Sequence, residues 1–382
     1  MKSAFPTNSP DSSSPRSPSI LFFIPCGRYV LSGVFRALDY IPLLEKDGFR
    51  CKAVSYSSPR QYYHTYIKER PKSFWSRMVR SVHFGGLYRL FKLLYVLSVA
   101  KRFDIIFLGK MALPKWWVRL LASVHTRIIF DIDDAVFLTD PERTNQLIKF
   151  ATVISAGSQF NLEHVRTINK NAVLLPTPVP THLYPETPRQ GERSDGYINI
   201  GWVGTLPNIK YLDLLHEPLR ILAEKKLTNP VRLILIGHIS FLEDLKSAFS
   251  PLEVWLRPYV DPQNLSASLA EFDIGVMPLF NGEFEKGKCA SKALVYMAAR
   301  IPVICSRVGE NKRIIQDGVN GYLASNTEEW VSKLTELVEN PELRKKMGAL
   351  GRKTVDEKYS TQVCYKILKH EVLIPLLGPD AP

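Results

Sequence analysis

Short apolar runs that alternate with amphipathic segments, in two successive sets, restrict the fold of this chain more than any other feature. The clearest apolar runs lie at 20–24, 103–109, 127–133, 151–157, 197–205, 231–237 and 272–279. They are apolar on both faces and are separated by helical patterns, which is typical of parallel strands covered by helices on two sides. The sequence therefore predicts an α/β protein with doubly wound parallel sheets.

A segment crowded with proline, threonine and charge separates the two sets of strands. It reads "LLPTPVPTHLYPETPRQGERSDG" (174–196), and the alternation begins again after it. At 382 residues the chain is too long for one ordinary core. We therefore predict two tandem Rossmann-like domains that face each other across a cleft. The expected divisions are a disordered tail (1–19), an N-terminal domain (20–178), a linker (179–196), a C-terminal domain (197–358) and a last helix that crosses back to the N-terminal domain (359–382).

Positive charge is concentrated in the first third of the chain. Residues 1–130 hold 21 Lys and Arg against 6 Asp and Glu, so they carry more than the whole net charge of +13. Such a surface favours an anionic partner, and a membrane leaflet or a phosphorylated lipid is preferred because no nucleic-acid-binding motif accompanies the charge. The five cysteines are scattered singly, which predicts a reducing cytoplasm and neither disulfides nor a structural metal site.

Two predicted helices bear on how this surface works. Residues 34–49 read as one amphipathic helix that carries Arg36. From Phe74 to Ala100, apolar side chains alternate with Arg and Lys, which is typical of a helix lying in a membrane interface. The alternative is a domain helix that packs on the sheet and exposes its charges to solvent.

Two loops of the C-terminal domain combine glycine with lysine at a helix start. "IGWVGT" places Gly204 and Thr205 after a strand, and Lys210 is expected in the first turn of the next helix. In "GKCASK", Gly287 frees the backbone, while Lys288 and Lys292 lie at the start of another helix. Exposed helix N–H groups and an ammonium together stabilise a phosphate, so the two loops predict an anion site. Solvated lysines on plain turns are the alternative.

Carboxylates cluster in the N-terminal domain at "FDIDDAVF" (130–137). Asp133 could accept hydrogen bonds from the hydroxyls of a ligand, with Asp134 supporting it. The alternatives are a cap for the next helix, or a metal site, which we disfavour because an Asp-x-Asp metal motif belongs to a different architecture.

Several of these segments are similar to one enzyme family. "IGWVGT", "FEKGKCASKALVYMAARIPVICSRVGENKRIIQDGVNGYLA" and "VLLPTPV" resemble the family-four retaining glycosyltransferases of the GT-B fold, in the branch with "GKCGFKLLEYMA"-type and "FDxDDA"-type segments. The likeness extends over about residues 20–375. It implies a nucleotide-sugar donor as substrate, no cofactor and no required metal.

The resemblance also implies roles for particular residues. Asp133, Lys210 and Glu285 are the expected catalytic residues, and Arg36 and Asp134 the acceptor-binding ones. For Arg36, the alternative is an exposed surface arginine on an amphipathic helix. The expected donor-binding residues are Gly204, Thr205, Lys210, Gly287, Lys288, Ser291 and Lys292. Three positions depart from the family. Thr205 stands where an arginine is usual, and Val295 stands where a glutamate binds the ribose. Gly287 stands in place of the paired glutamate, with Glu285 nearby.

The function that the resemblance implies is transfer of a sugar to a lipid-linked or polysaccharide acceptor in cell-envelope glycan synthesis. The enzyme would be peripheral at the inner face of the cell membrane. The alternative is a catalytically degenerate GT-B protein that binds sugar nucleotides or serves as a scaffold. An epimerase or a phosphorylase on the same fold is disfavoured.

Overall fold

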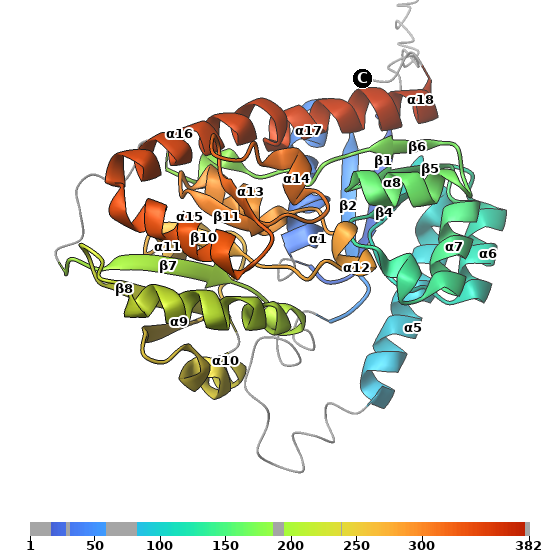
Figure 1. Ribbon diagram of the computed structural model, residues 1–382. Helices are drawn as coiled ribbons and strands as arrows, with labels where there is room; N and C mark the ends of the chain where they lie inside the picture. Colours follow the sequence, from blue (N-terminus) through green and yellow to red (C-terminus); the bar gives the residue numbers. More distant parts are fainter. Residues whose placement is uncertain (1–16, 28–30, 59–81, 186–194, 238, 379–382) are drawn as a thin grey trace, which may run out of the picture.

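The computed structural model describes residues 17–27, 31–58, 82–185, 195–237 and 239–378, and within them the chain forms two six-stranded parallel sheets (Figure 1). The strand order of the first sheet is β2-β1-β3-β4-β5-β6. Its strands are β1 (Ser19–Ile24), β2 (Arg50–Ser55), β3 (Ile105–Leu108), β4 (Ile128–Ile132), β5 (Val153–Ala156) and β6 (Ala172–Leu174). Every strand pair is parallel, so the carboxyl ends of all six strands lie along one edge.

The second sheet repeats this arrangement with the order β12-β11-β10-β7-β8-β9. Its strands are β7 (Ile198–Val203), β8 (Val231–Gly237), β9 (Glu253–Pro258), β10 (Ile274–Met277), β11 (Val303–Ser306) and β12 (Tyr322–Ala324). Helices flank each sheet (Figure 1). The predicted fold class, two doubly wound Rossmann-like domains, is therefore confirmed.

The helices of the N-terminal domain depart from the sequence pattern at its first crossover. The single helix predicted over 34–49 is instead α1 (Leu31–Phe35), a 3₁₀ turn (Leu38–Tyr40) and α2 (Ile41–Lys46). The chain leaves the helix at Ala37, whose φ is −137°. The other helices are α5 (Val82–Val99), α6 (Lys115–Val124), α7 (Pro141–Phe150) and α8 (Gln159–Arg166).

In the C-terminal domain, a 3₁₀ helix occupies the place where the first regular helix was expected to begin. This helix, η6 (Leu206–Leu215), carries Lys210 at its centre and leads directly into α9 (His216–Glu224). The further helices are α10 (Ile239–Leu245), α11 (Leu265–Leu269), α12 (Glu283–Lys286), α13 (Ser291–Ala298), α14 (Asn311–Ile314), α15 (Thr327–Glu339) and α16 (Pro341–Lys358).

The end of the chain lies against the N-terminal domain. Helix α17 (Thr361–Ile367), a π-helical segment (Leu368–Leu373) and α18 (Ile374–Leu377) follow one another along the top of both domains in Figure 1. Apolar side chains of this run pack with those of β1 and α2 in one buried cluster. The Tyr365 hydroxyl donates a hydrogen bond of 2.8 Å to Asp47 Oδ2, and the Lys369 ammonium lies 2.6 Å from the same oxygen.

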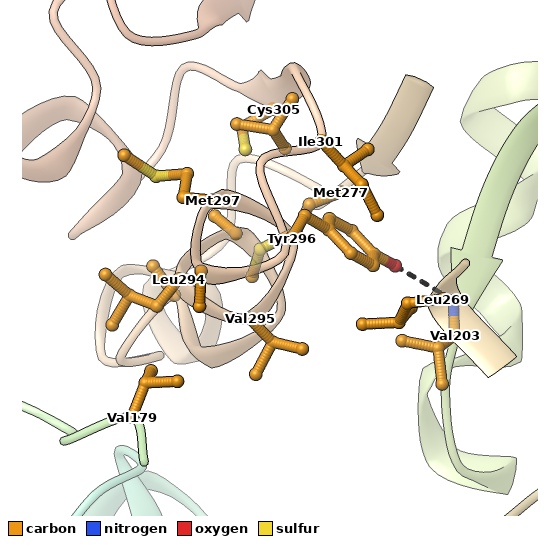
Figure 2. Packing of buried hydrophobic residues seen from close by; sticks show 14 of the residues in the cluster. Val179, Val203, Leu269, Met277, Leu294, Val295, Tyr296, Met297, Ile301 and Cys305 are labelled. Carbon is orange, nitrogen blue, oxygen red and sulfur yellow. Dashed lines mark hydrogen bonds between the residues drawn. The ribbon is translucent and has the colours of Figure 1, made fainter. Parts of the chain in front are cut away.

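Helix α13, which follows the lysine-bearing loop, is buried along its length. Its residues from Ala293 to Ala298 pack with β10, β11 and the end of β7 (Figure 2). The Tyr296 hydroxyl accepts a hydrogen bond of 2.9 Å from the backbone N–H of Val203, which ties the helix to the carboxyl end of β7. This packing fixes where the first turn of α13 lies, and so where Lys292 lies.

Two sequence predictions fall partly outside the described residues. The expected disordered tail (1–19) is described only from residue 17, and the membrane-interface segment expected from Phe74 is described from Val82 onward. In the described part of the chain, none of the helices combines the length and the apolar character that crossing a bilayer requires.

Candidate functional site

The two domains touch where the loop before α13 reaches the N-terminal domain. The Gly287 carbonyl accepts hydrogen bonds from Ser158 Oγ at 3.2 Å and Asn161 Nδ2 at 3.0 Å. A Cβ atom on Gly287 would lie 2.6 Å from the Cβ of Ala135, closer than two side chains can approach. Gly287 was expected to make room for a phosphate, but here it makes room for the other domain.

A second pair of contacts joins the domains beside this one. The Cys289 thiol donates to the Asp133 carbonyl oxygen at 2.7 Å. The Glu310 carboxylate accepts from the backbone N–H of Gln159 at 2.6 Å, in the first turn of α8. Burial of Glu310 raises its pKa, although the Gln159 N–H and Arg313 oppose this. Helix α8 therefore presents its amino end to the C-terminal domain, and the Glu310 carboxylate of that domain accepts a hydrogen bond from a free N–H group of the first turn.

Arg36 lies inside the N-terminal domain. Its side chain is 1% exposed and makes two hydrogen bonds to the Asp131 carboxylate, at 2.8 and 2.6 Å. It also donates to the Leu175 carbonyl at 2.8 Å and to Thr177 Oγ1 at 3.3 Å. The alternative of an exposed surface arginine is therefore wrong. The acceptor-binding role is not supported either, because an acceptor phosphate would have to displace Asp131.

Lys110, which the sequence pattern did not mark, neutralises the carboxylates of Asp133 and Asp134. Lys110 Nζ lies 2.8 Å from Asp133 Oδ1 and also pairs with Asp134 Oδ2. Burial favours the neutral amine of Lys110, but the two carboxylates outweigh burial and raise the pKa of its ammonium. The predicted sugar contact through Asp133 would therefore involve a carboxylate already held by Lys110. A position just after β3, at the carboxyl edge of a parallel sheet, could have marked Lys110.

On the C-terminal side, Glu285 is hydrogen-bonded to a tyrosine. Its carboxylate is 6% exposed and accepts a hydrogen bond of 2.6 Å from the Tyr211 hydroxyl. Burial and this hydrogen bond raise the pKa of Tyr211. Lys210 Nζ lies 3.7 Å from Glu285 Oε1, and the Lys210 side chain is 57% exposed. The predicted catalytic residues Lys210 and Glu285 are thus brought together, and Tyr211 joins them.

Thr205 connects to Lys288 through one amide. Thr205 Oγ1 accepts from Asn208 Nδ2 at 3.0 Å, and Asn208 Oδ1 accepts from Lys288 Nζ at 3.3 Å. The Lys288 ammonium also lies over the rings of Tyr211 and Phe284, 5.5 and 5.3 Å from their centroids. The two predicted donor loops therefore meet, and Lys288 faces the segment in which Thr205 stands.

Lys292 is brought to Gly204, as the pairing of the two loops predicts. Its ammonium lies 4.6 Å from the ring centroid of the buried Trp202, and a Cβ on Gly204 would come within 3.1 Å of Lys292 Nζ. Burial, together with the charge of Lys288, lowers the pKa of Lys292 to about 7. Ser291, the remaining predicted donor residue, is half-buried at the first position of α13.

Val295 is a core residue. It is 1% exposed and belongs to the apolar cluster shown in Figure 2. A glutamate at this position would be buried among apolar side chains, so the substitution suits the packing around α13. Across the described ranges, His, Cys, Asp and Glu side chains do not form any group of three or more that is suited to holding a metal ion.

The sequence of the C-terminal domain matches a known family. Residues 198–340 match the family described as glycosyl transferases group 1. This match covers most of the C-terminal domain and less than half of the chain. The site just described lies within it, since Thr205, Lys210, Lys288 and Lys292 all fall inside the matched residues.

One curated relative matches a short part of the chain. An uncharacterized glycosyltransferase of Methanocaldococcus jannaschii is 43% identical over 70 residues, which are 18% of this chain and 20% of that protein. The matched segment therefore spans about a fifth of the relative's length.

Solved structures match nearly the whole chain in fold. Sucrose-phosphate synthase from Thermosynechococcus elongatus has a TM-score of 0.64 at 11% identity, covering 92% of this chain and 97% of that one. The Anabaena protein HepE, solved in complex with UDP and glucose, has a TM-score of 0.61 at 13% identity, covering 92% and 98%. The matched segment thus lies in a chain with the GT-B fold.

Proposed function

We propose that this chain is a retaining glycosyltransferase that moves a sugar from a nucleotide-sugar donor to a lipid-linked or polysaccharide acceptor in cell-envelope glycan synthesis. The observation that carries the proposal is a group of three lysines around Tyr211 and Trp202, in which Glu285 is the only carboxylate paired with any of them among the described residues. Positive charge in excess of its counter-ions, inside a glycosyltransferase group 1 domain, suits a donor diphosphate.

The chemistry requires charge stabilisation more than a protein base. The bond between the anomeric carbon and the β-phosphate oxygen breaks, and the acceptor oxygen bonds to that carbon on the same face. The acceptor proton passes to the departing phosphate, so the step balances without a metal or a cofactor. Lys210, Lys288 and Lys292 stabilise the negative charge that develops on the leaving diphosphate. Retention itself is proposed from the family resemblance.

Contacts between the domains support an acceptor site on the N-terminal side, opposite these lysines. The Gly287 carbonyl is held by Ser158 and Asn161, and the Cys289 thiol is held by the Asp133 carbonyl. In this arrangement Asp133 and Asp134 lie next to the loop that carries Lys288. We propose that these two carboxylates accept hydrogen bonds from sugar hydroxyls and so orient them.

The acceptor is proposed to be anionic and membrane-borne. Helix α5 exposes Leu87 (52%), Leu90 (42%), Phe91 (63%) and Leu94 (49%), and α6 exposes Trp116 (48%) and Leu120 (45%). Arg89, Lys92 and Arg119 lie on the same two helices. Leu93 and Val96 on α5 are buried, so this helix packs on the domain with one face and leaves an apolar face open. Apolar and basic side chains together suit the anionic cytoplasmic leaflet.

Binding of nucleotides tests the enzymatic proposal. Purified protein is screened by thermal shift against UDP-, GDP- and ADP-sugars, then incubated with the donor that binds and with lipid extract as acceptor. A donor at about a hundred times its Kd stabilises the fold by about 2.7 kcal/mol, which raises the Tm by several degrees. Lys210→Ala should reduce the shift. Lys286→Met is the control, because Lys286 pairs with Glu283 on the surface. No shift with any donor would favour the degenerate scaffold.

Flotation with vesicles tests the membrane proposal. Wild-type protein should bind vesicles that contain phosphatidylserine and should be released by about 0.5 M salt, since surface electrostatics are screened within a few ångströms at that ionic strength. Phe91→Glu should abolish binding. Val319→Glu, at an exposed apolar position (38%) in the C-terminal domain, should leave it unchanged. Equal flotation of the two variants would argue against docking through α5.

A further inference from the structure

Lys292 and Lys288 differ from the other cations of the site in having no counter-ion among the described residues. Arg36, Lys110 and Lys210 all have a carboxylate within 4 Å. The Lys292 ammonium instead lies over the indole of Trp202 and beside Gly204, and the ion pairs of the described chain do not include it. A half-buried ammonium in contact with a ring and a glycine backbone is incompletely solvated and unneutralised.

The neighbouring lysines are less suited to hold an anion tightly. Lys210 is more than half exposed and leans toward Glu285, whose carboxylate would repel a phosphate. Lys288 already donates to Asn208 Oδ1 at 3.3 Å. Lys292 is also fixed by its helix, because α13 is packed along its length and tied to β7 through Tyr296. An anion beside Gly204 would therefore meet Lys292 as its most rigidly placed cation.

The charged groups around Lys292 favour loss of its proton while the site is empty. Lys288, on the loop before α13, repels its positive charge. Lys210 and Tyr211 on η6, and Glu285 on α12, are further titratable residues on this side of the site, and the Glu285 carboxylate is turned toward the Tyr211 hydroxyl. With a pKa of about 7, a large part of the Lys292 side chains is neutral at physiological pH.

We propose that Lys292 is the principal diphosphate-binding cation of this site, and that it enters the complex by taking up one proton from solvent. A neutral amine, a proton and a nucleoside diphosphate combine to give an ammonium held against the phosphate oxygens, with no bond to carbon made or broken. In this complex the Lys292 ammonium takes the role of the arginine that Thr205 replaces. It rests on the proposed function, because it assumes that the anion is the donor diphosphate.

Proton uptake makes binding weaken as the pH rises. Above pH 7.5 the terminal phosphate of UDP has already lost its second proton, since phosphate monoesters lose that proton at about pH 6. Between pH 7.5 and 8.5 the Kd for UDP should therefore increase by nearly tenfold, through the protein alone. Calorimetric titration in two buffers of different ionisation enthalpy should report the uptake of nearly one proton for each UDP bound at pH 8.5.

Three variants separate the roles of charge and protonation. Lys292→Met should raise the Kd for UDP by about ten- to a hundredfold at pH 7.5, because a charge-assisted contact is lost. Lys292→Arg keeps a cation that stays charged, so it should bind UDP with neither proton uptake nor the pH dependence. Lys286→Met is the matched control, from the same loop but already paired with Glu283, and should behave as wild type.

The outcomes distinguish this inference from the proposed function. If UDP, GDP or ADP binds but affinity does not change between pH 7.5 and 8.5, the proton-uptake proposal is wrong while the donor site stands. Binding by Lys292→Met as tight as that of wild type would remove Lys292 as the principal cation. If none of the three nucleoside diphosphates binds the folded wild-type protein, the proposed function fails, and this inference fails with it.

Discussion

The two edges that meet between the domains use their charges in opposite ways. On the N-terminal side, Arg36 is paired with Asp131, and Lys110 with Asp133 and Asp134. On the C-terminal side, Glu285 pairs with Lys210, whereas Lys288 and Lys292 have no paired carboxylate among the described residues. Charges that neutralise one another stabilise a shape without a ligand, whereas an excess of one sign is stabilised only when a ligand supplies the other. The N-terminal edge is thus a framework, and the C-terminal edge is a binding surface.

The strongest test of this contrast is to break the buried pair in the framework. Arg36→Met leaves the Asp131 carboxylate buried at 3% exposure, with only the Ser155 hydroxyl, at 2.6 Å, among its described hydrogen-bond donors. Removing one partner of a buried ion pair costs about 3–5 kcal/mol, because the other charge is left uncompensated. Urea unfolding, followed by circular dichroism, should show this loss.

A double variant serves as the control for the pair. Arg36→Met combined with Asp131→Asn removes both charges, so it should recover a large part of the lost free energy of unfolding. If the single variant were as stable as wild type, Arg36 would be free to serve an acceptor, as the sequence analysis expected.

A second test concerns the contact through which framework and binding surface meet. Gly287→Ala places a methyl group 2.6 Å from both Ala135 Cβ and Asn161 Oδ1. Relieving such a clash costs about 1–3 kcal/mol, and here the least costly response is for the domains to separate. Small-angle scattering should show a larger radius of gyration, and donor hydrolysis or transfer should fall.

Gly86→Ala is the matched control for that substitution. A Cβ on Gly86 meets nothing within 4 Å, and the residue lies inside helix α5. Alanine there should stabilise the protein by up to about 1 kcal/mol through helix propensity and leave its dimensions unchanged. An unchanged radius of gyration for Gly287→Ala as well would show that the interdomain contact yields without opening.

The same contrast explains what the sequence could and could not predict. Apolar strands and their spacing are local patterns, and they predicted both sheets and the fold class. The glycine and lysine loops were also correctly brought together, because carboxyl ends of parallel strands share an edge. Lys292 beside Gly204 is the clearest case.

The paired charges were harder to predict because their partners are distant in sequence. Arg36 and Asp131 are 95 residues apart, and Lys110 and Asp134 are 24 apart. A helix pattern over 34–49 gives no sign that Arg36 turns inward, and the break at Ala37 accompanies that burial. Gly287 was recognised as a position where the backbone must be approached closely, but the sequence could not say that the approaching group is Ala135.

The smallest predicted effect comes from a carboxylate of the N-terminal domain that, unlike Asp131, Asp133 and Asp134, is not paired with a cation among the described residues. Asp39 lies in the 3₁₀ turn before α2, and its Oδ2 atom is buried without a hydrogen-bond partner among the described residues. Burial raises the pKa of Asp39 to about 6. A carboxyl whose pKa is higher in the folded state favours folding at low pH. This stability is fully present below about pH 4, where the unfolded chain titrates, and it is lost as the pH rises through about 6.

Asp39→Asn should therefore raise the free energy of unfolding at pH 7.5 by about 1–2 kcal/mol, since a shift of two units is worth about 3 kcal/mol and partial solvation reduces it. The increase should disappear at pH 4, where the wild-type carboxyl is also neutral, and urea unfolding at both pH values measures the difference. Equal gains at the two pH values would mean that asparagine acts through a new hydrogen bond. A loss at pH 7.5 would mean that the Asp39 charge is compensated, and that the N-terminal framework has no unpaired member at this position.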